Sequence, residues 1–179
     1  MSVRSLLGIT ALMAVPAVLA AQHAGGAPPP VTRAPAEAGQ FDFLVGQWEL
    51  TVKPQATTLA ARLHGVPKLQ GTWKAWKALE GWGIEDELRI VDRSGNPMAF
   101  TLFVRVYDAA AKHWGISAVD AYRARITQST AEWRGTEMIT TGQGTDDDGK
   151  PQITRTSISA ITANGFRYRQ DRSSDGGKS

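Results

Sequence analysis

The chain contains no cysteine, and this absence excludes disulfide bonds, a thiol nucleophile and a lipid anchor on an N-terminal cysteine. A domain without disulfides has to be stabilised by its own hydrophobic core. The chain has 179 residues, which is long enough to build one.

An excess of charge of one sign is missing as well. Outside residues 1–20, 19 Lys and Arg stand against 17 Asp and Glu, a formal charge of +2. So balanced a composition gives no reason to expect nucleic acid or an anionic membrane as a partner.

Residues for metal binding or catalysis are few and scattered. His23 lies in a low-complexity segment, His64 in a loop, and His113 has no ligand type two or four positions away, whereas a metal site needs three or four convergent ligands. Residues 146–149 read DDDG but lack the spaced acids and closing Glu of a calcium loop, so we expect a solvated turn. Nucleophile-elbow, phosphate-loop and dinucleotide motifs are also absent. We expect no metal and no cofactor, nominate no catalytic residue, and leave enzyme activity open but not favoured.

The N-terminus has the pattern of a secretory signal peptide. Arg4 precedes an apolar run over residues 6–19, and Val18 and Ala20 suit cleavage near Ala20. The run is too short for a transmembrane helix. We therefore predict a signal peptide over residues 1–20 and a periplasmic or secreted protein without a transmembrane segment; the alternatives are a later cut near His23 and an N-terminal helix of the core.

Residues 21–40 are rich in Ala, Pro and Gly and have too few large apolar groups to offset the entropy of ordering, so we predict a disordered leader. The folded domain is expected over residues 41–179.

The body of the chain is predicted to be all-β. Residues 81–91 alternate with a period of two, and residues 100–107 place Thr101, Phe103, Arg105 and Tyr107 on one face. One short helix is expected within residues 57–63. The other strands are predicted at 49–53, 71–79, 114–118, 122–128, 131–140, 153–161 and 166–171. Roughly nine antiparallel strands in up-and-down order favour a barrel of eight to ten strands over a sandwich.

Several motifs occur in a defined order: FDFLVGQW at 41–48, LEGWG at 79–83, RVYD at 105–108 and SDGGK at 174–178. In this order they resemble a bacterial exported family of unknown function that opens FDF-x-x-G-x-W and is similar to the lipocalin-like (calycin) barrels. The resemblance implies that Phe41, Phe43, Gly46 and Trp48 form a structural plug at one end of the barrel. It also implies an Arg partner for Trp48 from the last strand region, with Arg167, Arg169 and Arg172 as candidates.

The same resemblance raises the possibility of a missing last strand, because the family continues beyond the DGGK turn with a Trp and a further strand. A barrel without that strand would have an open C-terminal edge, and such an edge favours a partner strand or an edge-strand oligomer.

Charged residues within otherwise apolar strands mark the candidate binding site. Asp86 interrupts the face of Trp82 and Ile84, and Arg105 shares a face with two aromatic residues. If these faces line the interior, the two charges need each other or a ligand; the alternative is that Asp86 reaches the rim and Arg105 faces solvent. The proposed ligand-binding residues are Trp82, Asp86, Phe103, Arg105, Tyr107 and Trp114, although a core role is favoured for the tryptophans over a ligand cage.

Three functions follow as hypotheses. The first is a non-enzymatic exported barrel that binds a small apolar or amphipathic ligand. The second is an enzyme on the same barrel, with Asp86 or a neighbouring acid as general base and Arg105 stabilising negative charge. The third is a structural or interaction module that pairs through an open edge.

Overall fold

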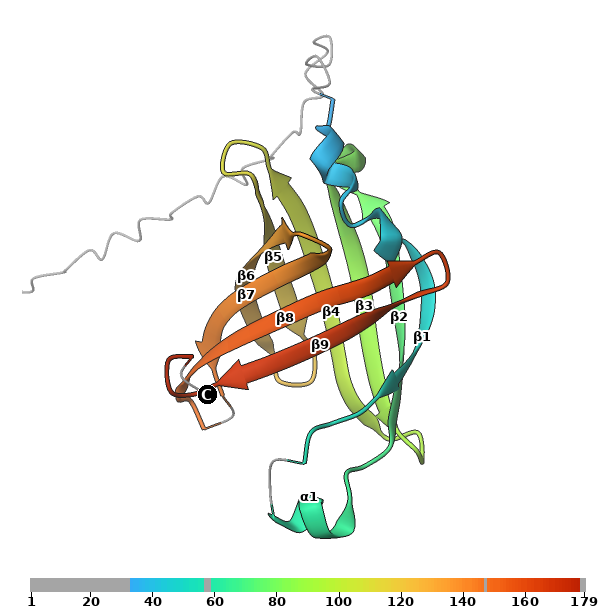
Figure 1. Cartoon of the computed structure of the whole chain (residues 1–179), viewed down its shortest axis with the longest axis vertical. Helices are drawn as coiled ribbons and strands as arrows, with labels where there is room; N and C mark the ends of the chain where they lie inside the picture. The colour runs from blue at the N-terminus through green and yellow to red at the C-terminus, as the bar shows by residue number, and fades with distance from the viewer. Residues whose placement is uncertain (1–32, 57–58, 147, 178–179) are drawn as a thin grey trace, which may run out of the picture. The chain divides into compact units, whose positions relative to one another are not determined.

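Nine antiparallel strands follow one another along the chain, and each pairs with the next (Figure 1). The structure, a computed structural model, describes residues 33–56, 59–146 and 148–177, so the predicted signal peptide and the leader up to residue 32 lie outside it. The strands are β1 (Gly46–Val52), β2 (Leu69–Ala78), β3 (Gly83–Asp92), β4 (Pro97–Asp108), β5 (His113–Asp120), β6 (Arg125–Arg134), β7 (Glu137–Thr145), β8 (Pro151–Thr162) and β9 (Gly165–Ser173). The predicted up-and-down meander is confirmed.

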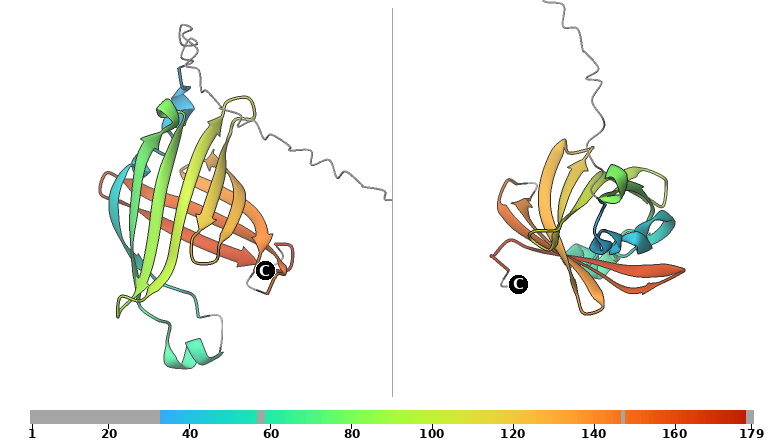
Figure 2. Two further views of the ribbon diagram at one scale, coloured as in Figure 1. Left: turned by 180° about the vertical axis from the view of Figure 1, so that it is seen from behind. Right: turned by 90° about the horizontal axis from the view of Figure 1, so that it is seen from above.

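The sheet curves into a nearly closed barrel whose seam lies between β1 and β9. These strands pair only with β2 and β8, and the end-on view leaves the ring incomplete (Figure 2). Side chains bridge the seam at one end, where the ring centroids of Trp48 and Phe166 are 5.2 Å apart and Trp73 meets Phe166 and Tyr168 at 5.8 and 5.4 Å. The barrel therefore keeps two unpaired backbone edges, with aromatic contacts at one end of the gap.

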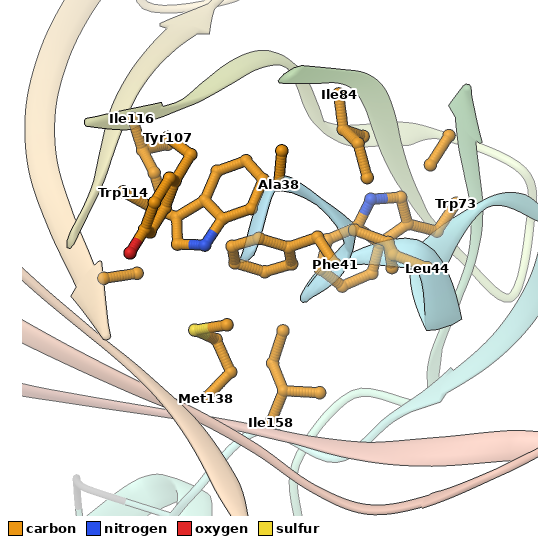
Figure 3. Packing of buried hydrophobic residues seen from close by; sticks show 12 residues of the cluster. Ala38, Phe41, Leu44, Trp73, Ile84, Tyr107, Trp114, Ile116, Met138 and Ile158 are labelled. Carbon is orange, nitrogen blue, oxygen red and sulfur yellow. The ribbon is translucent and has the colours of Figure 1, made fainter. Parts of the chain in front are cut away.

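The two-residue alternation of the strands decides which side chains fill the barrel. In β4, Arg105 and Tyr107 are buried, whereas Val106 between them is 38% exposed. Figure 3 shows Trp73, Trp114, Met138 and Ile158 converging from different strands on the same interior. The face predicted for Thr101, Phe103, Arg105 and Tyr107 is thus the inner one.

Two short 3₁₀ helices close one end of the barrel: η1 (Ala36–Gly39) and η2 (Asp42–Leu44). Phe41 and Leu44 are completely buried, and the Phe41 ring meets the edge of Trp114 at 4.8 Å (Figure 3). Residues 33–40, which the sequence assigns to the leader, belong to this end, because Ala38 is buried and the Gln40 side chain accepts a hydrogen bond from Trp114 Nε1 at 3.0 Å. The composition of residues 33–40 predicts disorder, but these small residues are ordered because they pack against the core of the barrel.

Burial falls off toward the opposite end. Leu50, Ile90 and Ala118 lie on the inner face of β1, β3 and β5, yet each is only partly buried. The barrel is densely packed beside η1 and η2, and solvent reaches its inner face farther away.

Some strand boundaries differ from the prediction. The sequence suggests strands at 122–128 and 131–140, but β6 runs without a break through the polar residues between them, and the chain turns at Gly135, where φ is +60°. β3 begins at Gly83, so Trp82 lies outside the strand in which it was expected. A glycine marks the boundary in both places: Gly135 has a positive φ at the turn, and Gly83 is the first residue of β3.

A short helix, α1 (Leu59–His64), follows β1 and agrees with the predicted helix within 57–63. In the described part of the chain, no helix combines the length and apolar character needed to cross a membrane.

Candidate functional site

A buried ion pair joins the two central strands. Arg105 Nε and Nη2 donate to the two carboxylate oxygens of Asp86 at 2.5 and 3.0 Å, and the indole Nε1 of Trp73 donates to the same carboxylate at 2.7 Å. Asp86 is 0% and Arg105 4% exposed. Three strands therefore supply one interior polar cluster, formed by Trp73 on β2, Asp86 on β3 and Arg105 on β4.

The register of β3 and β4 places the pair diagonally. Asp86 lies opposite Phe103, and Arg105 lies opposite Ile84, so the two side chains reach each other across one step of the ladder. Gly83 permits this approach, because a Cβ at that position would lie 2.3 Å from the Arg105 carbonyl oxygen. Any larger residue at position 83 would displace the backbone that holds Arg105.

Aromatic rings surround the guanidinium. The Cζ atom of Arg105 lies 4.9 Å from the centroid of Phe41 and 4.8 Å from that of Phe103, and Phe103 stacks on Trp73 at 6.3 Å. Cation–π contacts of this kind contribute most where water is excluded. They also exclude water from the Asp86–Arg105 hydrogen bonds on that side.

The carboxylate of Asp86 is a poor candidate for a general base. Three N–H donors occupy its oxygens, and solvent does not reach it. A base must have a lone pair within reach of the substrate proton. The arrangement instead stabilises the negative charge of Asp86 and orients Arg105.

One nitrogen of the guanidinium has no role in the pair. Arg105 Nη1 has no hydrogen-bond partner among the described residues, although every buried side-chain nitrogen and oxygen of those residues has one. It follows that solvent reaches Nη1.

Tyr168 of β9 lies beside the polar cluster, because its ring centroid is 5.4 Å from that of Trp73. The residue is 36% exposed at the seam, but its hydroxyl meets Thr156 and accepts a hydrogen bond from Gln170 at 3.3 Å. Desolvation raises the pKa of the phenol, and Thr156, Arg105 and Arg172 partly oppose that rise. The phenol therefore remains neutral at neutral pH.

The structure brings together three of the six proposed site residues. Asp86, Phe103 and Arg105 are in contact. Tyr107 and Trp114 pack against each other at 5.6 Å, and Trp82 follows the short helix η3 (Leu79–Gly81). Trp114 reaches the pair only through Phe41.

The plug residues are likewise assembled at one end. Phe43 meets Phe41 and Phe166, and the Trp48 indole donates to the Leu44 carbonyl at 2.8 Å. Gly46 has a φ of +133°, which only glycine adopts readily. In the described chain, Phe166 rather than an arginine of β9 packs on Trp48.

Sequence reasoning did not assign Trp73 and Tyr168 to the site. Trp73 had a usable signal, since the alternation of β2 places it on the face opposite Trp76, which is exposed. Tyr168 had none, because only the curvature of the sheet brings its side chain on β9 against Trp73 on β2.

Two hollows on the described surface lie elsewhere. Arg155, Ser157, Ser159, Arg167 and Arg169, with two acids, line one on the outer face of β8 and β9; the other lies beside Lys112 and Glu132. Neither includes Asp86 or Arg105.

Together these features define an up-and-down antiparallel β-barrel with a buried ion pair and an unpaired seam. No protein-family profile, curated protein or solved structure matches the chain.

Proposed function

We propose that the protein is an exported, lipocalin-like barrel that binds a small amphipathic molecule, with the anionic head group of that molecule beside Arg105. The observation that carries the proposal is Arg105 Nη1, a donor on a buried cation that has no partner among the described residues and is not completely enclosed. A carboxylate or phosphate would supply the missing acceptor.

The inner face beyond the pair suits an apolar tail. Leu50, Ile90 and Ala118 face inward but are only partly buried, and a ligand in contact with them would remove apolar surface from water. The seam offers a route of entry between β1 and β9.

An interaction module remains the second candidate, because the edges of β1 and β9 are unpaired. β9 carries Arg167, Arg169 and Arg172 against one acid, Asp171, and this net positive charge disfavours pairing of the edge strand with a second copy of itself. Self-association through this edge is therefore disfavoured, and ligand binding remains the first proposal.

The test compares a fluorescent long-chain fatty acid with the corresponding alcohol on the unaltered protein. We expect the affinity for the acid to be about tenfold higher than that for the alcohol, because the carboxylate can accept a charge-assisted hydrogen bond from Arg105. Native mass spectrometry of the protein purified from its producing cells should also show a retained adduct of lipid size. Equal affinities for acid and alcohol, or no binding of either, would contradict the proposal.

Variants locate the site. Asp86→Leu/Arg105→Met removes both charges without leaving one unpaired, and it should abolish the preference for the acid. Arg89→Met is the matched control, because this guanidinium lies over Phe100 at 3.9 Å on the outer face. Since the comparison on the unaltered protein needs no variant, a folding defect cannot hide the result.

A further inference from the structure

The loop between β1 and β2 lies at the barrel end opposite the plug. We name its described residues, 53–56 and 59–68, the tip loop. β1 leads into it from the plug end and β2 returns from it, and Figure 1 shows α1 beyond the ends of the strands. The tip loop is therefore the part of the described chain that a flat surface approaching this end would meet first.

Two leucines of the tip loop are exposed. Leu59 and Leu63 are 73% and 71% exposed, the largest values among the exposed large apolar residues of the described chain. They are four positions apart on α1 and so lie on one face of the helix. A pair of exposed leucines on one helical face is a feature of surfaces that bind an apolar partner.

The charge of this loop is entirely positive. Residues 53–68 contain Lys53, Arg62 and Lys68 and no Asp or Glu, although the chain outside residues 1–20 is nearly neutral. Arg62 Nε donates to the Ala56 carbonyl at 3.4 Å, which keeps the cation on the loop. The balanced total charge thus conceals a local segregation of charge.

We propose that the tip loop docks on an anionic phospholipid bilayer, with Leu59 and Leu63 inserted at the interface and Lys53, Arg62 and Lys68 among the head groups. Short amphipathic segments with apolar and basic residues bind such interfaces, and each basic residue near an anionic surface adds to the affinity. A second copy of the chain is a poorer occupant, because a two-fold contact would bring the cations of the two loops together.

Acidic residues limit the docking surface to the tip loop itself, and one of them, Asp92, lies opposite Leu69 next to it. Asp146 and Asp148 lie in the turn between β7 and β8, at the same end of the barrel. An anionic surface repels them. The inference goes beyond ligand binding and does not require it, although docking would bring the open end of the barrel to a source of amphipathic molecules.

The experiment is co-sedimentation of the processed protein with vesicles of phosphatidylcholine, alone or mixed with phosphatidylglycerol. Binding to the mixed vesicles should be about tenfold stronger and should weaken as salt rises. Leu59→Ser/Leu63→Ser and Arg62→Glu should each reduce it about tenfold. The matched controls are Val106→Ser, on the outer face of β4, and Lys112→Glu, at the plug end; both should bind as the unaltered protein does.

A spectroscopic readout reports insertion directly. Because the chain has no cysteine, Leu63→Cys and Lys112→Cys each give one labelling site for a polarity-sensitive dye. The emission should shift to the blue on mixed vesicles for position 63 only. A shift at both positions, undiminished binding of Leu59→Ser/Leu63→Ser, or no binding by the unaltered protein would overturn the proposal.

The outcomes also separate this proposal from the others. A dimer in light scattering that Leu59→Ser/Leu63→Ser dissolves would replace membrane docking with self-association. Asp86→Leu/Arg105→Met should still bind vesicles, and Leu59→Ser/Leu63→Ser should still bind the fatty acid in solution. Loss of one activity with retention of the other therefore identifies which proposal has failed.

Discussion

Arg105 takes part in two kinds of interaction at once. Its Nε and Nη2 groups donate hydrogen bonds to Asp86, while its guanidinium contacts the rings of Phe41 and Phe103. A buried pair of this kind is costly to desolvate, so it adds little net stability compared with apolar residues of similar size, but removing one partner leaves an unpaired buried charge. The pair therefore constrains substitution more strongly than it stabilises the fold.

This asymmetry can be measured in a double-mutant cycle. Arg105→Met alone should lower the free energy of unfolding by about 3–5 kcal/mol, because it leaves the buried Asp86 carboxylate without a cationic partner. Asp86→Leu/Arg105→Met should recover most of that loss. Chemical denaturation followed by tryptophan fluorescence gives both values. A cost below about 1 kcal/mol for Arg105→Met would mean that the pair behaves as an exposed one.

At the scale of elements, the seam sets β1 and β9 apart from the other strands. Each has one neighbour, and the aromatic contact of Trp48 with Phe166 links them without backbone hydrogen bonds. Charged side chains on β9, including Arg167 and Arg169, discourage uncontrolled pairing of its edge.

Hydrogen exchange tests the open seam. The amides on the free edges of β1 and β9 should exchange much faster than those of β3 and β4, which are hydrogen-bonded on both sides. Exchange measured by NMR or mass spectrometry compares these strands within one sample, so β3 and β4 serve as the internal control. Equal protection of β9 and β4 would indicate that the seam is sealed in solution.

For the molecule as a whole, the proposed export depends on residues that the structure does not describe. We expect the protein recovered from the producing cell to lack about the first 20 residues, in line with small residues at positions 18 and 20. Intact-mass measurement of the periplasmic and secreted fractions checks this. Ala20→Tyr should leave a precursor or shift the cut, and a full-length cytoplasmic protein would refute export.

Much of the barrel could be predicted from local pattern, and the exceptions have local explanations. The alternation of residues 100–107 grouped Thr101, Phe103, Arg105 and Tyr107 on one face because a strand has a strict period of two, but it left open which face points inward. The positions of Asp86 and Arg105 stayed open for the same reason, and the structure decided that both are buried and pair with each other. The turn at Gly135 was missed because polar residues inside β6 resemble a turn, although they lie in an unbroken strand.

The sequence by itself determined the period of each strand, the short connections that make neighbours antiparallel, and the residue types able to fill or cap the barrel. Only the tertiary structure decided that Trp73 binds Asp86, that Phe166 rather than an arginine meets Trp48, and that residues 33–40 join the core. These contacts join strands or segments distant along the chain, and the curvature of the sheet, which no local pattern encodes, brings them together.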